Sequence, residues 1–526
     1  MTPPTASGPP TAGTAESVML DGGPLSIGDV VRVSRRGRPV AIGPKAMAAM
    51  EASRGVVEAH LADGRAHYGI NTGFGSLSRQ RIGAGDLVEL QRNLIRSHAA
   101  GVGEPLADDV VRAMLLALAA SLARGCSGVR PLVAQQLVAM LNAGVTPVVP
   151  AIGSVGASGD LAPLAHATLV LMGEGEAWSG AGASRRRMDG AAALRSAGLG
   201  PLVLEPKEGL ALINGTHLMS GQGALLAADF ERLFSAASLA CAMSIDGCRA
   251  TDSFLDGRVY AARNQPGAIL VAGRLRRLLA GSGIIPSHRT DDPRVQDPYS
   301  FRCAPVVLGA AWDCYQYVLG AVHRELGAVT DNPLVFPGGG PGASIVSAGN
   351  FHGMPVALPL DALALAIAHV AGISERRTFY LLSGVDGESR LPAFLSPSPG
   401  LHSGLMIAQY TAAACCNEII GLAAPASVAN LTTSAGMEDY NSFGPRSAAK
   451  ARRALELAAS VVAIELVCAA EALEHQRPLR SGGAVEKAHS AIRAVVPRLA
   501  ADRPPAPDIA AMAALVWSGA LESTSA

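Results

Sequence analysis

Residues Ala151 to His166 read AIGSVGASGDLAPLAH, with Ala157-Ser158-Gly159 at the centre. Three consecutive small residues remove the side-chain bulk that normally separates an amide nitrogen from the carbonyl two residues earlier. The nitrogen of Gly159 could then attack the carbonyl carbon of Ala157. Loss of water from this ring and from the Ser158 side chain would leave a five-membered ring with an exocyclic methylidene, an electrophile that ordinary side chains do not supply. A flexible loop between two helices is the alternative that composition alone leaves open.

The chain around this stretch is apolar and balanced in charge. Of its 526 residues, 49% are hydrophobic, 4% are aromatic and 16% are charged, with 43 basic and 43 acidic side chains. Ala, Leu and Val dominate the apolar share, a mix that favours helices over sheets. A net charge of zero argues against nucleic acid as a partner. So much apolar surface with so few charges indicates burial between subunits.

The N-terminal residues, the apolar runs and the cysteines together favour a cytoplasmic protein. Residues 1–17 lack both the basic region and the apolar core of a signal peptide, and they predict a disordered tail. Runs without charge, such as 209–228, are interrupted by polar residues and glycines, so we expect no membrane span. The eight cysteines include no CxxC pair, which favours a reduced protein without a structural zinc site or other metal.

The spacing of apolar residues predicts a mainly α-helical fold in two parts. Residues 18–204 are expected to form a smaller mixed N-terminal domain that contains the 157–159 triplet, and residues 205–526 a long helical bundle. At the start, residues 18–42 alternate like a short β-hairpin around an Arg-Gly turn. The helical segments indicated by the spacing are 44–63, 85–97, 108–124, 130–141, 161–173, 209–243, 304–329, 355–382, 405–424 and 446–473.

Several ordered motifs between residues 18 and 519 resemble the histidine and aromatic amino-acid ammonia-lyases and their aminomutase relatives. These motifs are YGINTGFG, LQRNLIRSHAAGVG, GSVGASGDLAPLAH, KEGLALINGTH, VQDPYSFR, VTDNPLVF and GNFHG. The resemblance implies that Ala157, Ser158 and Gly159 cyclise autocatalytically to 4-methylideneimidazol-5-one (MIO), so that no external cofactor is needed. It also implies a homotetramer whose active sites are shared between subunits and whose substrate is an amino acid, a small molecule.

The same resemblance assigns roles outside the triplet. It gives Tyr68 the task of removing the β-proton of the substrate, a task for which a phenol needs donors or positive charge to stabilise its anion. It places Arg302 on the substrate carboxylate through a bidentate pair. A loop tyrosine that anchors the fold and a structural ion pair are the respective alternatives. The positions expected around the ring and the substrate are Asn214, Gln296, Tyr299 and Phe351, each of which could instead serve packing or hydrogen bonding within the fold.

Ser97, His98 and Glu438 bear on the choice of substrate. The resemblance implies that the Ser97-His98 pair faces the substrate side chain, and enzymes acting on histidine carry Ser-His there. Glu438 matches a glutamate of histidine lyases that many phenylalanine or tyrosine enzymes replace with glutamine. Both His98 and Glu438 could hydrogen-bond an imidazole, which a plain phenyl ring would leave unpaired. We therefore expect elimination of ammonia from L-histidine to give trans-urocanate.

Other substrates and outcomes stay open at this point. The positions that depart from the usual histidine-lyase pattern are Ile152, His217, Met354 and Met437. Tyrosine aminomutases can also carry a Ser-His pair, so an aminomutase, or a lyase acting on tyrosine or another amino acid, is the alternative function. A non-catalytic scaffold with the same helical bundle would predict loss of Ser158 or Tyr68, and both are present.

Overall fold

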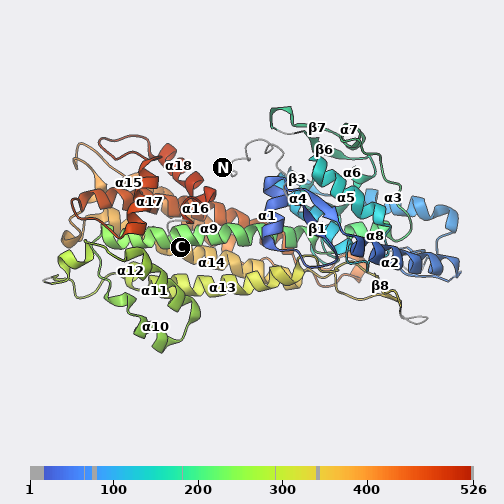
Figure 1. Ribbon diagram of the computed structural model, residues 1–526, viewed down its shortest axis with the longest axis horizontal. Coiled ribbons are helices and arrows are strands. Elements are labelled where there is room, and N and C mark those ends of the chain that lie inside the picture. The colour runs from blue at the N-terminus through green and yellow to red at the C-terminus, as the bar shows by residue number, and fades with distance from the viewer. Residues whose placement is uncertain are drawn as a thin grey trace.

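Long, nearly parallel helices form the body of the molecule (Figure 1). The computed structural model describes residues 17–63, 65–73, 80–180, 182–290, 292–338 and 344–522. Residues 1–16 of the expected tail and the part of YGINTGFG from residue 74 onwards lie outside them. The bundle consists of α9 (His217–Gly247), α13 (Ala304–Glu325), α14 (Met354–Ser383), α15 (Met406–Ala423) and α16 (Gly444–His475), and α14 contacts each of the other four. The prediction of a mainly α-helical fold with a long bundle is confirmed.

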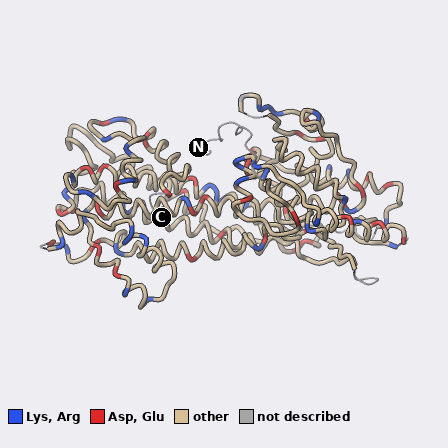
Figure 2. The backbone as a smooth tube through the Cα atoms, viewed as in Figure 1, with Lys and Arg blue, Asp and Glu red and all other residues tan. Residues whose placement is uncertain are grey.

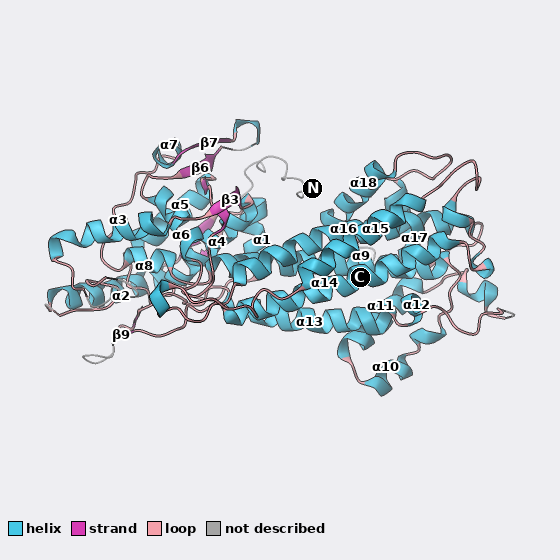
Figure 3. Ribbon diagram, turned by 180° about the vertical axis from the view of Figure 1, so that it is seen from behind, coloured by secondary structure: helices cyan, strands magenta, loops and turns pink. Residues whose placement is uncertain are grey.

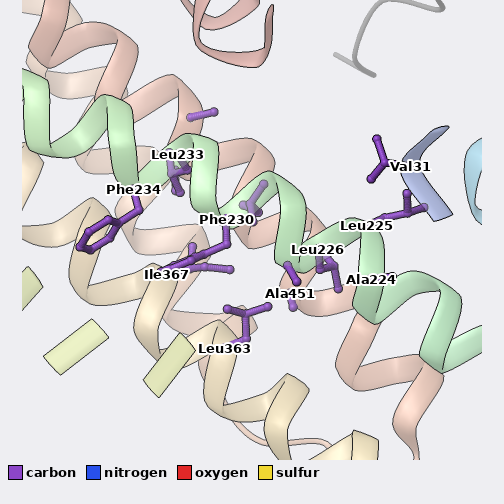
Figure 4. Packing of buried hydrophobic residues seen from close by; sticks show 14 of the residues in the cluster. Val31, Ala224, Leu225, Leu226, Phe230, Leu233, Phe234, Leu363, Ile367 and Ala451 are labelled. Carbon is purple, nitrogen blue, oxygen red and sulfur yellow. The ribbon is translucent and has the colours of Figure 1, made fainter. Parts of the chain in front are cut away.

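The centre of the bundle is closed by apolar side chains from several helices (Figure 4). Phe230, Leu233 and Phe234 of α9 are completely buried, as are Leu363 and Ile367 of α14. Helix α14 is long and apolar enough to cross a membrane by length and composition alone, but most of its apolar stretch is buried inside the fold. Its hydropathy is therefore accounted for by its central place in the bundle.

Shorter helices cover the end of the bundle that lies far from the N-terminal elements (Figure 1). They are α10 (Gly257–Arg263), α11 (Pro266–Leu279), α12 (Tyr299–Arg302), α17 (Gly483–Arg493) and α18 (Pro505–Ser518). Helix α11 packs on α9 and α13, whereas α12 contacts α13 and α14.

The N-terminal part is smaller and mixed, with its strands gathered at one end of the molecule (Figure 3). Its helices are α1 (Ile27–Arg36), α2 (Pro44–Ala62), α3 (Leu87–His98), α4 (Asp108–Leu122), α5 (Pro131–Ala143), α6 (Leu161–Leu171), α7 (Gly190–Ser196) and α8 (Glu208–Ile213). Strands β3 (Val102–Pro105) and β5 (Pro150–Ile152) pair antiparallel. At the same end of the molecule, β8 (Leu334–Val335) and β9 (Ile345–Val346), which come from the segment between α13 and α14, also pair antiparallel. A small sheet joins β4 (Thr146–Pro147), β6 (Glu176–Ser179) and β7 (Arg186–Asp189).

The hairpin expected over residues 18–42 is wrong. Strands β1 (Val18–Leu20) and β2 (Val40–Ile42) pair in parallel, and α1 connects them. Ser26 and Asp29 form a reciprocal capping box at the start of α1, and Gly37 ends the helix with a φ of 64°. The alternation of DVVRVS fits a strand, but the same residues also place Val30 and Val33 on one buried helical face.

The helix expected over residues 209–243 is interrupted. Helix α8 ends at Ile213 and α9 begins at His217, while Gly215 between them has a φ of 122°. This break turns the backbone of Asn214 and Gly215 towards the loop of residues 153–160, where the candidate site lies.

Charges of both signs are interspersed along the backbone (Figure 2). Within the residues that the structure describes, no group of three or more His, Cys, Asp or Glu side chains could hold a metal ion. All eight cysteines are free thiols.

Candidate active site

The loop that contains Ser158 lies between β5 and α6 and is held by backbone contacts from two distant segments. The amide of Gly353, just before α14, donates to the carbonyl of Gly156 at 3.1 Å. Ser442 Oγ donates to the same carbonyl at 2.9 Å, and the Phe443 amide donates to Val155 O at 2.9 Å. The starts of α14 and α16 therefore hold in place the backbone of Val155 and Gly156, directly before the triplet.

Two donors converge on the carbonyl oxygen of Ser158. Asn214 Nδ2 lies 2.7 Å from this oxygen, and the Gly215 amide nitrogen lies 3.3 Å from it. The Asp160 amide in turn donates to Gly215 O at 2.8 Å, so the two segments run side by side. Such a pair of donors stabilises negative charge that develops on the carbonyl oxygen.

Glycine is required at position 159 for two reasons. Its φ is 75°, a region that residues with a side chain adopt only with strain. A Cβ atom there would lie 2.1 Å from the carbonyl oxygen of Gly215. The close approach of the two backbones thus depends on the missing side chain.

The groups that would form a ring are unencumbered, and the Ser158 hydroxyl is held. Among the described residues, neither the amide nitrogen of Gly159 nor the carbonyl oxygen of Ala157 takes part in a hydrogen bond. Ser158 Oγ donates to Glu438 Oε1 at 3.0 Å. The other carboxylate oxygen of Glu438 accepts from Thr433 Oγ1 at 3.2 Å.

Asp160 joins this loop to the start of α9. It is completely buried, and its Oδ2 accepts from the amides of Leu218 and Met219 in the first turn of α9 at 2.9 and 3.1 Å. Burial raises the pKa of Asp160 to about 7, although these amides and Ser154 favour the ionised carboxylate. A buried carboxyl group therefore titrates close to neutral pH directly behind the triplet.

His217, one of the departures seen in the sequence, stands beside the two converging donors. It begins α9 with only 3% of its surface exposed, and burial lowers its pKa to about 3. A Cβ atom on Gly215 would lie 2.8 Å from His217 Nε2, so the imidazole packs directly on that glycine. The ring is therefore neutral at physiological pH and forms part of the wall behind Gly215.

Other expected site residues lie at this end of the molecule. Ser97 and His98 end α3, which packs on α6 and α8. Phe351 lies two residues before Gly353, whose amide binds the triplet loop. Tyr68 precedes Gly69, whose added Cβ would meet Leu210 of α8 at 3.1 Å. His98 Nδ1 donates to Leu94 O at 2.8 Å, which leaves Nε2 as the acceptor of the neutral ring.

Gln296, Tyr299 and Arg302 lie at the opposite end of the bundle. Arg377 Nη1 of α14 contacts the carbonyl of Ser300 in α12 at 3.4 Å, whereas the residue before α14, Gly353, contacts the triplet loop. The intervening helix spans about 35 Å at a rise of 1.5 Å per residue. One chain therefore does not bring these three residues to its own Ser158 (Figure 1).

Tyr299 and Arg302 are nevertheless accessible from outside the chain. Tyr299 is 69% exposed, and the Arg302 guanidinium carbon lies 4.4 Å from the centre of its ring. Arg302 Nε donates to Asp297 O at 3.0 Å, and its terminal nitrogens have no hydrogen-bond partner among the described residues. These nitrogens can receive a carboxylate from outside the chain.

A model of one protein family, described as aromatic amino acid lyase, matches residues 25–494. The chain belongs to this family. A histidine ammonia-lyase of Anaeromyxobacter dehalogenans is 50% identical over 96% of this chain and 100% of its own. The crystal structure of histidine ammonia-lyase from Trypanosoma cruzi matches with a TM-score of 0.89 and 39% identity, covering 97% of this chain and 95% of that one. A tyrosine aminomutase from Streptomyces globisporus matches with a TM-score of 0.90 and 33% identity, covering 97% and 98%.

Membership of this family makes the protein a carbon–nitrogen lyase of the ammonia-lyase type. The resemblance found in the ordered motifs is thereby confirmed. The non-catalytic scaffold is disfavoured because Ser158 and its donors are in place.

Sequence reasoning did not find Asp160, Thr433 or Ser442. Asp160 directly follows the triplet, and an aspartate before a helix ordinarily caps that helix. Instead its side chain makes no cap to α6 and binds the start of α9. The partner helix of such a carboxylate follows only from the tertiary structure.

Proposed function

We propose that the protein eliminates ammonia from L-histidine to give trans-urocanate. The observation that carries the proposal is the pair of donors, Asn214 and Gly215, on the carbonyl of Ser158 within a loop of small residues. The histidine ammonia-lyase that is 50% identical over nearly the whole chain supports the substrate.

The residues present fit an MIO group formed from Ala157, Ser158 and Gly159. The Gly159 nitrogen and the Ala157 carbonyl are free to join, and the left-handed backbone of Gly159 draws the chain into a tight turn. The Ser158 carbonyl would become the ring carbonyl, on which Asn214 and Gly215 already converge. When formed, this group supplies an electrophilic carbon that binds the substrate amine and makes it a better leaving group.

The remaining chemistry belongs to side chains of the chain itself. Tyr68 removes the β-proton of the substrate. Arg302 binds the substrate carboxylate through its free terminal nitrogens, with Gln296 and Tyr299 beside it. Asn214 and Gly215 stabilise negative charge on the Ser158 carbonyl during the reaction. Phe351 lines the site beside the ring.

Ser97, His98 and Glu438 select the substrate side chain in this proposal. His98 Nε2 is an acceptor, so it can receive the N–H of an imidazole, and Glu438 offers a second acceptor. The same Nε2 can receive the hydroxyl of tyrosine, and the tyrosine aminomutase neighbour has the same fold over nearly all of this chain. An aminomutase or lyase acting on tyrosine is therefore the second candidate.

The separation of Arg302 from Ser158 supports a homotetramer with shared active sites. A complete site needs the Tyr299 and Arg302 of another copy, because about 35 Å separates the two groups along α14. The exposed face of α14 carries Leu358, Leu365 and Phe379 at spacings of whole heptads, with exposures of 51%, 45% and 46%. Phe379 and Tyr299 line one shallow groove of about 550 Å³. The apolar face of α14 is therefore continuous with the residues proposed to bind the substrate carboxylate. We place the assembled enzyme in the cytoplasm.

Two experiments test the proposal. Purified protein is incubated with L-histidine and L-tyrosine, and urocanate, coumarate and β-tyrosine are measured by mass spectrometry. Urocanate formation supports the proposal, whereas untouched histidine with coumarate or β-tyrosine contradicts the substrate. Co-expression of the inactive variants Ser158→Ala and Arg302→Ala should restore part of the activity, because mixed tetramers regain intact sites. No activity in the mixture would exclude sharing of sites between chains.

A further inference from the structure

His166 of α6 connects two of the ordered motifs by a hydrogen bond. It is the last residue of AIGSVGASGDLAPLAH, which contains the triplet, whereas Gly101 follows Ser97 and His98 in LQRNLIRSHAAGVG. The Gly101 amide donates to His166 Nε2 at 3.0 Å. No step of the proposed reaction uses His166, yet its hydrogen bond reaches the turn that follows His98.

Consecutive backbone amides hold the turn between α3 and β3. The Ala100 amide donates to His98 O at 2.9 Å, and the next amide, that of Gly101, has His166 as its acceptor. A Cβ atom on Gly101 would lie 3.2 Å from both His166 Nε2 and Pro150 Cβ, so the imidazole packs closely on this backbone. Helix α6 therefore holds the backbone three residues after His98.

The same turn packs on the segment just before the triplet. Strands β3 and β5 pair beside it. A Cβ atom on Gly153 would lie 3.0 Å from Gly101 Cα and 3.1 Å from the Cβ of Ala162 in α6. The turn after His98 therefore contacts both the segment that precedes the triplet and the helix that follows it.

Only the neutral form of His166 can make the contact with Gly101. A backbone N–H needs an acceptor, and Nε2 is an acceptor only when the ring proton is on Nδ1. Burial lowers the pKa of His166, which favours the neutral ring. Within the part of the chain that the structure describes, Nδ1 has no hydrogen-bond partner, so the ring binds the Gly101 amide alone.

Two contacts together determine where His98 Nε2 lies. The first is the hydrogen bond of 2.8 Å from His98 Nδ1 to Leu94 O, which orients the imidazole relative to α3. The second is the contact of His166 with Gly101, which holds the end of α3 relative to the triplet. Without the second contact, the end of α3 can shift relative to Ser158 while the imidazole keeps its orientation on the helix.

We propose that His166 is a positioning residue for recognition of the substrate side chain, because through the Gly101 amide it holds His98 where the imidazole of L-histidine binds. The inference rests on the proposed function, in which His98 faces that side chain. His166 itself does not touch the substrate. Its loss therefore weakens binding, which raises KM, more than it slows the chemical step.

The test compares two substitutions of nearly equal length. His166→Gln keeps an acceptor oxygen at about the position of Nε2, whereas His166→Met keeps the length but has only a weak acceptor. With the purified full-length enzyme and L-histidine, KM should rise about tenfold in His166→Met, while kcat stays within about threefold of the wild type. In His166→Gln both constants should stay within about threefold of the wild type.

Two controls separate positioning from a general loss of stability. Thr168→Ala alters the same helix, because Thr168 Oγ1 donates to Leu164 O within α6, and it should lower Tm without raising KM. In a double-mutant cycle, His166→Met added to His98→Ala should give a KM within about twofold of that of His98→Ala, because His166 acts through His98. Independent structural damage would multiply the two effects instead.

Four results would overturn the inference. His166→Met could keep the wild-type KM, His166→Gln could raise KM as much as His166→Met, or the effects of His166→Met and His98→Ala could multiply. The fourth is an unchanged KM in His98→Ala while the wild type forms urocanate. If His166→Met does not fold, hydrogen exchange of the wild-type enzyme replaces it, and the Gly101 amide should exchange more slowly than an unprotected amide. Exchange at the unprotected rate would equally overturn the inference.

The same measurements separate this inference from the proposed function. A wild-type enzyme that forms no urocanate from L-histidine contradicts the proposed function and, with it, the inference. A wild-type enzyme that forms urocanate while the folded His166→Met variant keeps its KM contradicts only the role of His166.

Discussion

Replacing Asn214 with alanine removes the closer of the two donors on the Ser158 carbonyl. Asn214 Nδ2 lies 2.7 Å from that oxygen, and the Gly215 amide, at 3.3 Å, remains. Loss of one donor of this kind costs about 10²–10³-fold in kcat, or about 3–4 kcal/mol of transition-state stabilisation. We expect a loss of that size for Asn214→Ala with L-histidine.

The stability of the same variant should change little. The side-chain oxygen of Asn214 is buried without a partner among the described residues, so the substitution removes an unsatisfied acceptor together with one hydrogen bond. The backbone amide of Asn214 still donates to Leu210 O. The free energy of unfolding should therefore fall by no more than about 1 kcal/mol.

The assay follows urocanate absorbance to obtain kcat and KM. The measured kcat is divided by the fraction of chains that have formed the ring, which are the chains that have lost two molecules of water. This correction separates catalysis from ring formation. Asn142→Ala is the control, because Asn142 exchanges two hydrogen bonds of 2.9 Å with Val40 and has no contact with Ser158. It should lose about 1–3 kcal/mol of stability but keep its kcat. A folded Asn214→Ala variant that keeps kcat within about tenfold of the wild type would refute the reasoning.

Three further predictions concern Gly159 and Asp160 of this loop and His217, which packs on Gly215 behind it. Gly159→Ala should prevent formation of the conjugated MIO ring and so abolish its near-ultraviolet absorbance, and an absorbance of wild-type intensity would contradict this. The same variant should lower the free energy of unfolding by about 2–5 kcal/mol in urea titrations, because of left-handed strain and overlap with Gly215 O. In the folded chain the pKa of Asp160 is raised from 3.8 to about 7, so the folded chain keeps a proton that the unfolded chain releases, and stability falls as pH rises from about 4 to 7. Asp160→Asn should flatten this part of a plot of Tm against pH. An unchanged slope would exclude Asp160 as the cause of the pH dependence. Burial lowers the pKa of His217 to about 3, so the free energy of unfolding decreases as pH falls from 6.5 towards 3, and His217→Gln should reduce that decrease. The variant should leave the shape of the kcat/KM–pH profile between pH 6 and 9 unchanged. A shifted profile would show that His217 titrates during turnover.

Much of the fold follows from local pattern. The expected segments 355–382, 405–424 and 446–473 agree with α14, α15 and α16 to within two residues at each end. In these segments the apolar periodicity is long and the ends are marked, for example by Gly384 after α14. Local pattern was misleading in residues 18–42, where a short alternating run serves either a strand or one face of a helix.

The sequence by itself determined the chemistry that is available: the small residues around Ser158, the helical periods, and the ordered motifs that define the family. The tertiary structure decided which groups meet. The break between α8 and α9 falls at Asn214-Gly215-Thr216, an Asn-Gly turn signal that the apolar run on either side obscured. Only the tertiary structure shows that Asn214 and Gly215 bind the Ser158 backbone there. Glu438 meets Ser158 from 280 residues away. Arg302 and Ser158 lie near opposite ends of α14, and they cannot meet within one chain because the helix is rigid and rises about 1.5 Å per residue.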